Sequence, residues 1–187
     1  MKDFTKLPET TLKAIGEKHE PYPIKLAIKK ANPNYSPSSD SYSMNCQRCV
    51  LAYELLRRGY NVQAKAYKGD KDKYPYLWSK TFGKVERCPV ANMREISEWT
   101  RRHSDNGCGR YIIHIAWDEG SGAHVFNLEL KNNRLISADA QVHKMSVLKK
   151  YVTRRDTDEY MLIYRTDNVK FNRKIYGVIK RGTKDYE

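Results

Sequence analysis

The chain has 187 residues and a formal net charge of +13, from 35 basic and 22 acidic side chains. No run approaches the roughly 20 apolar residues of a membrane-spanning helix, and the first residues lack the apolar core of a secretion signal. We therefore expect one domain over residues 1–187, made in the cytoplasm and without a membrane span. The charge suits an anionic partner such as nucleic acid, but the basic residues are spread along the chain without a recognition motif and identify no partner.

The cysteines are expected to be reduced thiols, because a chain of this size without a secretion signal does not depend on disulfides. They are Cys46, Cys49, Cys88 and Cys108. Cys46 and Cys49 are one helical turn apart, but no second close pair and no suitably spaced histidines accompany them. The sequence thus predicts neither a metal site nor a cofactor.

Residues 1–40 are interpreted as a leading helical and loop segment. Helices are expected at Glu9–Lys18 and Ile24–Ala31, and the stretch over residues 32–42 is rich in turn-forming residues. This segment leads directly into the part of the chain with the strongest chemical signal.

A helix is predicted between Asn45 and Gly59, where apolar residues recur at helical spacing. Asn45 suits the N-cap, and Gly59 suits the left-handed position after the last turn. Cys46 then lies in the first turn, where the free N–H groups and partial positive charge of the helix end stabilise a thiolate, the reactive form of the side chain. Cys46 is therefore the candidate nucleophile, whereas Cys49 is expected in the core.

The middle of the chain is expected to contain a strand, a long loop and a second helix. In order, these are the strand Tyr60–Tyr67, a loop over residues 68–91 with Trp78 and Phe82 as its large apolar anchors, and the helix Met93–His103. Asn92 and Glu95 form a variant of the capping box in front of this second helix.

The second half of the chain alternates as an antiparallel sheet would. The expected strands are Arg110–Trp117, Ala123–Lys131, Arg134–Gln141 and Tyr160–Arg165, with a basic helix near Ser146–Val152 and a final segment, Val169–Ile179, of open type. The sequence therefore predicts an α+β fold in which N-terminal helices that carry the nucleophile pack on an antiparallel β-sheet.

One hairpin of this sheet brings chemically useful side chains together. Asn132 and Asn133 suit a two-residue turn, because asparagine tolerates positive φ, and this turn fixes the register of the two strands. His124 then lies opposite Gln141, with Asp139 as its diagonal neighbour on the same face.

A nucleophilic cysteine needs a base that takes its proton and a third group that orients the base. A helix packed across the face of His124 would bring Cys46 to it. The pattern thus predicts a triad of Cys46, His124 and Asp139, with His114 as a reserve base. Gln141 would either orient His124 or close the hydrogen-bond network.

Several motifs occur together in this chain. They are Asn32-Pro-x-Tyr, Asn45-Cys-Gln-Arg-Cys-Val-x-Ala-Tyr-Glu, Arg58-Gly-Tyr-x-Val-x-Ala, Ala123-His-Val-Phe and Asp139-x-Gln. In combination, over residues 32–179, they resemble the papain-fold toxin domains of bacterial polymorphic toxins and of some phage minor head proteins. The resemblance implies a papain-like fold, with Cys46 as nucleophile, His124 as general base and acid, and Asp139 as the orienting group.

The chain departs from papain-like peptidases in its oxyanion hole. Such peptidases place a glutamine shortly before the cysteine, but residues 38–44 contain none. The backbone N–H of Cys46 can supply one donor. The other is left open among Gln141, Gln47 and Asn45, the last only if its side chain does not cap the helix.

The leading hypothesis is a cysteine-dependent hydrolase that acts on amide bonds of a protein substrate through an acyl-enzyme. Peptide cleavage, glutamine deamidation and transamidation can all use this machinery. The resemblance implies a toxin or effector, with an immunity protein or a phage head component as partner, delivered into a target cell or carried by a phage particle. One alternative is a catalytically idle basic module that binds nucleic acid or phage particles. Redox chemistry through Cys46 and Cys49 ranks last.

Overall fold

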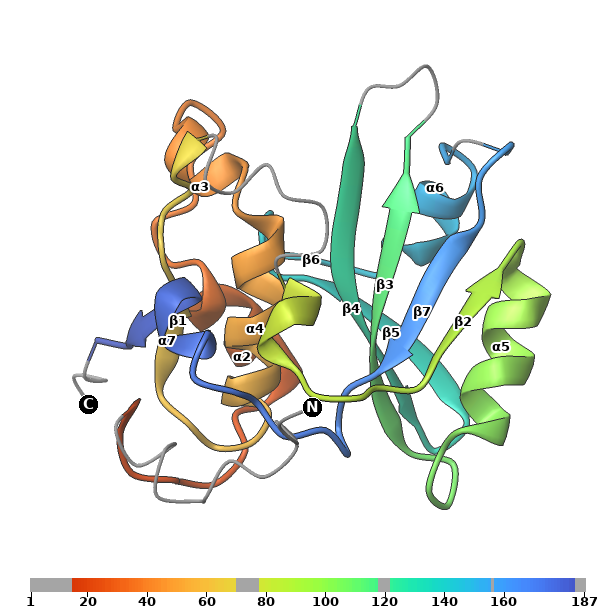
Figure 1. The fold of residues 1–187 in the computed structure, drawn as a ribbon, viewed down its shortest axis with the longest axis horizontal. Coiled ribbons are helices and arrows are strands. Elements are labelled where there is room, and N and C mark those ends of the chain that lie inside the picture. The colour runs from red at the N-terminus through yellow and green to blue at the C-terminus, as the bar shows by residue number, and fades with distance from the viewer. Residues whose placement is uncertain (1–14, 70–77, 118–121, 156, 184–187) are drawn as a thin grey trace.

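The computed structural model describes residues 15–69, 78–117, 122–155 and 157–183. These residues form the expected α+β fold, in which a helical half lies beside an antiparallel sheet (Figure 1). Within the described ranges, no helix is long and apolar enough to cross a membrane.

The described strands form two antiparallel sheets. The larger has six strands in the order β2-β7-β3-β4-β5-β6. They are β2 (Arg87–Val90), β3 (Gly109–Ala116), β4 (Ala123–Lys131), β5 (Arg134–Asp139), β6 (Lys144–Met145) and β7 (Met161–Arg165). In the smaller sheet, β1 (Val62–Ala64) pairs with β8 (Ile179–Arg181).

The helices divide between the two halves of the molecule (Figure 1). The helical half contains α2 (Ile24–Ala31), α3 (Asp40–Ser43), α4 (Cys46–Leu56), α7 (Ile175–Val178) and the 3-10 helix η3 (Trp78–Thr81). The helices α5 (Met93–Arg102) and α6 (Leu148–Val152) lie on the far side of the large sheet from α4.

The C-terminal end of α4 confirms the role predicted for Gly59. Its N–H donates to the Leu56 carbonyl, and the N–H of Tyr60 donates to the Leu55 carbonyl, both at 3.0 Å. This is the Schellman arrangement, and it needs the positive φ of +93° that Gly59 adopts. A Cβ atom at Gly59 would lie 2.0 Å from the carbonyl oxygen of His19, so the position also excludes side chains.

The β4–β5 hairpin has the predicted register. Asn132 and Asn133 have φ values of 50° and 60°, as a two-residue turn of the primed type requires. Lys131 therefore pairs with Arg134, and the pairing continues along the strands only as far as Asn127 with Ala138. Beyond that pair, the β4–β5 ladder stops before it reaches His124.

Polar contacts fix α4 on one face of the sheet. The Asn127 side chain donates to the Val50 carbonyl at 3.2 Å, and the Tyr53 hydroxyl donates to Glu129 at 2.6 Å. Elsewhere on α4, the fully buried Glu54 pairs with Arg110 of β3 at 3.0 Å. The helix that carries Cys46 is thus fixed against β3 and β4.

The opposite face of β4 packs into a second core. Phe126 and Leu128 belong there, among side chains from α5, α6, β3 and β7. The prediction that the nucleophile helix packs across this face is therefore wrong, because α4 contacts the alternate residues of β4. Sequence alternation identifies two faces but cannot say which helix covers which.

Other elements depart from the sequence predictions. Most of the predicted helix Glu9–Lys18 lies outside the described residues, and Lys18 itself forms an antiparallel bridge with Tyr60. The predicted loop over residues 68–91 contains η3 and the edge strand β2, apart from residues 70–77, which lie outside the described part. The sequence did not indicate β2 because it contains Pro89, and proline has no N–H to donate to a neighbouring strand. A strand at the edge of a sheet tolerates proline. The final segment forms α7 and β8.

Candidate active site

Cys46 opens α4, as the sequence predicts. The helix starts on the Asn45 carbonyl, which accepts hydrogen bonds from the N–H groups of Arg48 at 2.9 Å and Cys49 at 3.1 Å. The Cys46 thiol is free and partly exposed. As the first residue of α4, Cys46 has no helical carbonyl one turn before it to accept from its own N–H. The helix start therefore presents the sulfur together with a backbone donor.

The Asn45 side chain does not cap α4. It is turned into the interior and pairs with Asn32: its Nδ2 donates to Asn32 Oδ1 at 3.1 Å, and Asn32 Nδ2 donates back at 3.3 Å. The Cys49 thiol also donates to Asn45 Oδ1, at 3.1 Å. Asn45 is only 2% exposed, so its amide is occupied and does not serve as the oxyanion donor.

His124 and Asp139 form a direct hydrogen-bonded pair. The distance from His124 Nε2 to Asp139 Oδ2 is 2.8 Å, and the two side chains are 11% and 1% exposed. The Cys46 side chain lies close enough to His124 to raise the pKa of the imidazole. Because Nε2 contacts Asp139, Nδ1 is the ring nitrogen that the carboxylate does not hold. The three predicted residues thus lie together.

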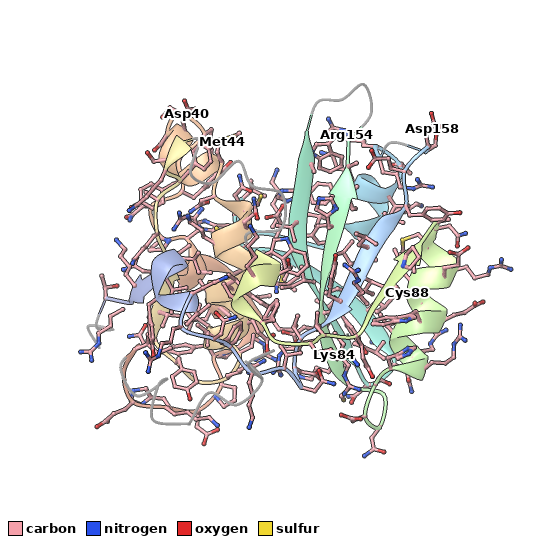
Figure 2. The ribbon with its side chains drawn as sticks, viewed as in Figure 1. Asp40, Met44, Lys84, Cys88, Arg154 and Asp158 are labelled. Carbon is pink, nitrogen blue, oxygen red and sulfur yellow. The ribbon has the colours of Figure 1, made fainter. Side chains whose placement is uncertain are left out.

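The early end of the β4–β5 ladder explains how the helix reaches His124. His124 is three residues beyond the last paired residue, Asn127, so no β5 partner occupies its edge. Figure 2 shows the two sides of this region at one end of the molecule. Met44, two residues before Cys46, lies on the helical side, and Arg154, whose guanidinium covers Trp117 at 5.8 Å, lies on the sheet side.

The ionisation of the pair follows from these contacts. Burial opposes the charge on His124, but the hydrogen bond to Asp139 and the nearby Cys46 side chain outweigh it and raise the pKa of His124 to about 10. Burial likewise opposes the charge on Asp139, but the bond from His124 helps to hold the pKa of that carboxyl below its ordinary value. At neutral pH the pair is an imidazolium and a carboxylate, and such a cation stabilises a neighbouring thiolate.

Aromatic rings enclose the imidazole. Trp117 and Phe126 each lie with ring centroids 6.0 Å from His124, nearly parallel to it, and Tyr151 meets it edge-on at 5.4 Å. The Tyr151 hydroxyl also donates to Asp139 Oδ2 at 2.6 Å. The sequence analysis missed Tyr151, because its short helix was interpreted only as basic. Its position three residues after buried Leu148 was the available signal.

Gln141 connects the two halves of the site. Its backbone N–H donates to Asp139 Oδ1 at 3.1 Å, and its carbonyl accepts from Asn32 Nδ2 at 2.9 Å. Its side-chain Nε2 donates to the Ser43 carbonyl. Gln141 thus closes the network between Asp139 and the segment before Cys46, which was one of the three roles predicted for it, beside orienting His124 and supplying the oxyanion donor.

Two further candidates lie close by. Gln47 is partly buried in the first turn of α4, directly after Cys46, and is still a candidate oxyanion donor. His114 lies on β3, where burial and the charge of His124 lower its pKa to about 4. It is therefore neutral at pH 7.

Cys49 is a core residue, as predicted. It is 1% exposed, and burial together with the nearby Cys46 and Asp139 raises its pKa well above the ordinary value. In the part of the chain that the structure describes, no group of three or more His, Cys, Asp or Glu side chains is arranged to hold a metal ion.

Comparisons of the chain with protein-family models, curated proteins and solved structures gave no match. Any assignment of function must therefore come from the chemistry of this site.

Proposed function

We propose that the protein is a cysteine-dependent hydrolase of amide bonds, built on a papain-like fold with Cys46, His124 and Asp139 as its triad. The observation that carries the proposal is the double contact of one imidazole. His124 is hydrogen-bonded through Nε2 to the buried Asp139 carboxylate at 2.8 Å, and the thiol of Cys46 at the start of α4 lies close enough to raise the pKa of the same imidazole. This is the arrangement that an activated nucleophile needs.

The reaction would proceed by acyl transfer. The Cys46 sulfur attacks the amide carbonyl carbon and forms a C–S bond, while the developing oxyanion meets the N–H of Cys46. His124 gives its proton to the leaving nitrogen as the C–N bond breaks. Water then attacks the thioester, His124 takes the water's proton, and the acid is released with the free thiol restored.

A protein is the proposed substrate, and peptidase and glutamine deamidase are the two proposed activities. The toxin or effector role rests on the resemblance of the cysteine and histidine motifs to papain-fold toxin domains. On that basis, an immunity protein or a phage head component is the proposed partner.

The first experiment compares two cysteines within one molecule. Cys108 is exposed and lies in a turn, whereas Cys46 is only partly exposed. In a brief iodoacetamide treatment at neutral pH, peptide mass spectrometry should find Cys46 alkylated faster than Cys108, because Cys46 lies at a helix start beside the imidazolium of His124. His124→Ala should slow the reaction at Cys46 and leave Cys108 unchanged. Equal rates at the two positions would contradict the proposal.

The second experiment identifies the reaction. Candidate proteins are incubated with the wild-type protein or with Cys46→Ala and analysed by intact mass. Fragments indicate a peptidase, a small mass gain at glutamine indicates a deamidase, and cross-linked dimers indicate a transamidase. Cys46→Ala should lose the activity by roughly 10⁴-fold or more while its stability changes by less than about 1 kcal/mol. Salt-sensitive nucleic-acid binding with an unreactive Cys46 would favour the idle binding module instead.

A further inference from the structure

Asp139 has more hydrogen-bond donors than a simple orienting group needs. Its Oδ2 accepts from His124 Nε2 at 2.8 Å and also from the Tyr151 hydroxyl at 2.6 Å. Its Oδ1 accepts from the N–H of Gln141 at 3.1 Å. His124 and Tyr151 therefore share one oxygen of the carboxylate.

The Tyr151 ring is fixed in this position. It meets the rings of Trp117 and Phe126 edge-on, with centroids 5.4 Å and 5.2 Å away. It also meets His124 edge-on at 5.4 Å with an interplanar angle of 90°. Packing on three rings holds the hydroxyl at Asp139 without any ordering step when a substrate arrives.

We propose that Tyr151 is a positioning residue of the proposed hydrolase: by sharing Asp139 Oδ2 with His124, its hydroxyl limits how strongly the carboxylate holds the imidazolium. A histidine held too tightly as a cation gives up its proton slowly to a leaving nitrogen. The Tyr151 hydroxyl stabilises part of the Asp139 charge and so leaves His124 able to act as the acid. This inference rests on the proposed function.

The titratable and charged groups around His124 and Tyr151 come from several elements. Those around His124 are Cys46 of α4, Asp139 of β5 and His114 of β3. Those around Tyr151 are Asp139, Arg154 and Tyr35, and the charge of Asp139 also acts on Cys49. Burial and the adjacent carboxylate raise the pKa of Tyr151 itself, so the hydroxyl is still a donor at neutral and moderately alkaline pH. Removal of the hydroxyl leaves every charge in this set in place.

The test is Tyr151→Phe, which keeps the ring and deletes only the hydroxyl. Tyr111→Phe is the matched control, because the Tyr111 hydroxyl is also buried but donates to the carbonyls of Thr100 and His103, both at 2.8 Å. For each full-length protein, the rate of alkylation of Cys46 by iodoacetamide is measured as a function of pH, with thermal unfolding as a check on folding.

In the profile of Cys46 alkylation rate against pH, the transition at alkaline pH reports the deprotonation of His124. We expect this transition to move upward by about 0.5–1 pH unit in Tyr151→Phe, because Asp139 Oδ2 then accepts from His124 without sharing its charge with the Tyr151 hydroxyl. Tyr111→Phe should keep the wild-type profile. No shift, a downward shift, or the same shift in both variants would overturn the proposal. A wild-type Cys46 that reacts no faster than Cys108 would instead contradict the proposed function, and the role of Tyr151 with it.

Discussion

In the described part of the chain, two helices begin after an asparagine, and the two beginnings differ. At α5, Asn92 caps the helix: its side chain accepts from the Glu95 N–H at 3.0 Å. The Glu95 carboxylate in turn accepts from the Ala91 N–H at 2.8 Å and from Asn92 Nδ2 at 2.9 Å. The donors and acceptors at this start satisfy one another.

At α4, the asparagine is turned away from its own helix. Asn45 pairs with Asn32 in the interior, so the first turn around Cys46 has no side-chain cap. A side-chain cap stabilises the start of a helix and occupies its N–H groups. Without such a cap, the positive potential of the helix start is available to stabilise an anion. The contacts that Asn45 makes inside the protein offset the missing cap. Under the proposed function, this contrast separates a structural helix from a helix that activates a thiol.

If the uncapped start of α4 activates Cys46, we expect it to do so together with the neighbouring His124 imidazolium. In Asp139→Ala, His124 loses its carboxylate partner, so less imidazolium faces Cys46 at neutral pH. The kcat of the proposed hydrolase should fall by about 10²–10³-fold, as expected when a proton-transfer group loses its support. Alkylation of Cys46 at pH 7 should slow in parallel.

Asp139→Asn is the matched control for this loss. The amide oxygen can still accept from His124 Nε2 but carries no charge, so its activity should lie between wild type and Asp139→Ala. If Asp139→Ala keeps the wild-type alkylation profile and kcat, then the buried pair is structural and the start of α4 acts alone.

The interior contacts of Asn45 can be broken directly. Asn45→Ala removes the hydrogen bonds that Asn45 Nδ2 donates to Asn32 Oδ1 at 3.1 Å and to the Lys65 carbonyl at 3.4 Å. The free energy of unfolding in urea should fall by about 2–3 kcal/mol, because buried polar groups lose hydrogen bonds. Alkylation of Cys46 should slow as the helix start loosens. A stable variant with unchanged alkylation would show that this network does not hold the nucleophile.

Local sequence signals predicted much of the fold. Gly59 indicated the end of α4 because glycine readily adopts the left-handed conformation that follows the last turn of a helix. Asn132 and Asn133 indicated the register of the hairpin because a two-residue turn fixes which residues of the two strands pair. These features depend on a few neighbouring residues, so the sequence contains the information needed to place them.

Features that depend on distant contacts were missed. The sequence could not show that Asn45 would choose Asn32 over its own helix, since both roles suit an asparagine. Nor could it assign the faces of β4, because both faces are largely buried. Tyr151 reaches Asp139 only through the tertiary placement of α6.

The difference between the two helix starts should also be visible in the pH dependence of stability. The pKa of His124 is raised from 6.5 to about 10, so the stability it contributes is complete below pH 6.5 and is lost as pH rises through about 10. The free energy of unfolding should fall by up to about 5 kcal/mol over that interval, at about 1.4 kcal/mol for each unit of the pKa shift. On the acid side, the lowered pKa of Asp139 makes its contribution disappear as pH falls below the ordinary carboxyl range.

His124→Ala is the control for the alkaline arm, measured by urea unfolding at matched pH values. It should lack the decline between pH 6.5 and 10, because the group that titrates is gone. An equal decline in both proteins would mean that other groups cause the loss of stability at alkaline pH. It would also contradict the conclusion that His124 is an imidazolium at neutral pH.

The smallest expected effect is at the capped helix. Asn92→Ala removes the side-chain acceptor of the Glu95 N–H, which should lower the free energy of unfolding by about 1 kcal/mol. Because α5 packs against the second core rather than against α4, the alkylation rate of Cys46 should not change. A slower Cys46 in Asn92→Ala would mean that the two helix starts are coupled through the sheet. If Cys46 is alkylated at the wild-type rate in Asn92→Ala but more slowly in Asn45→Ala, then the reactivity of the thiol depends on the inward orientation of Asn45.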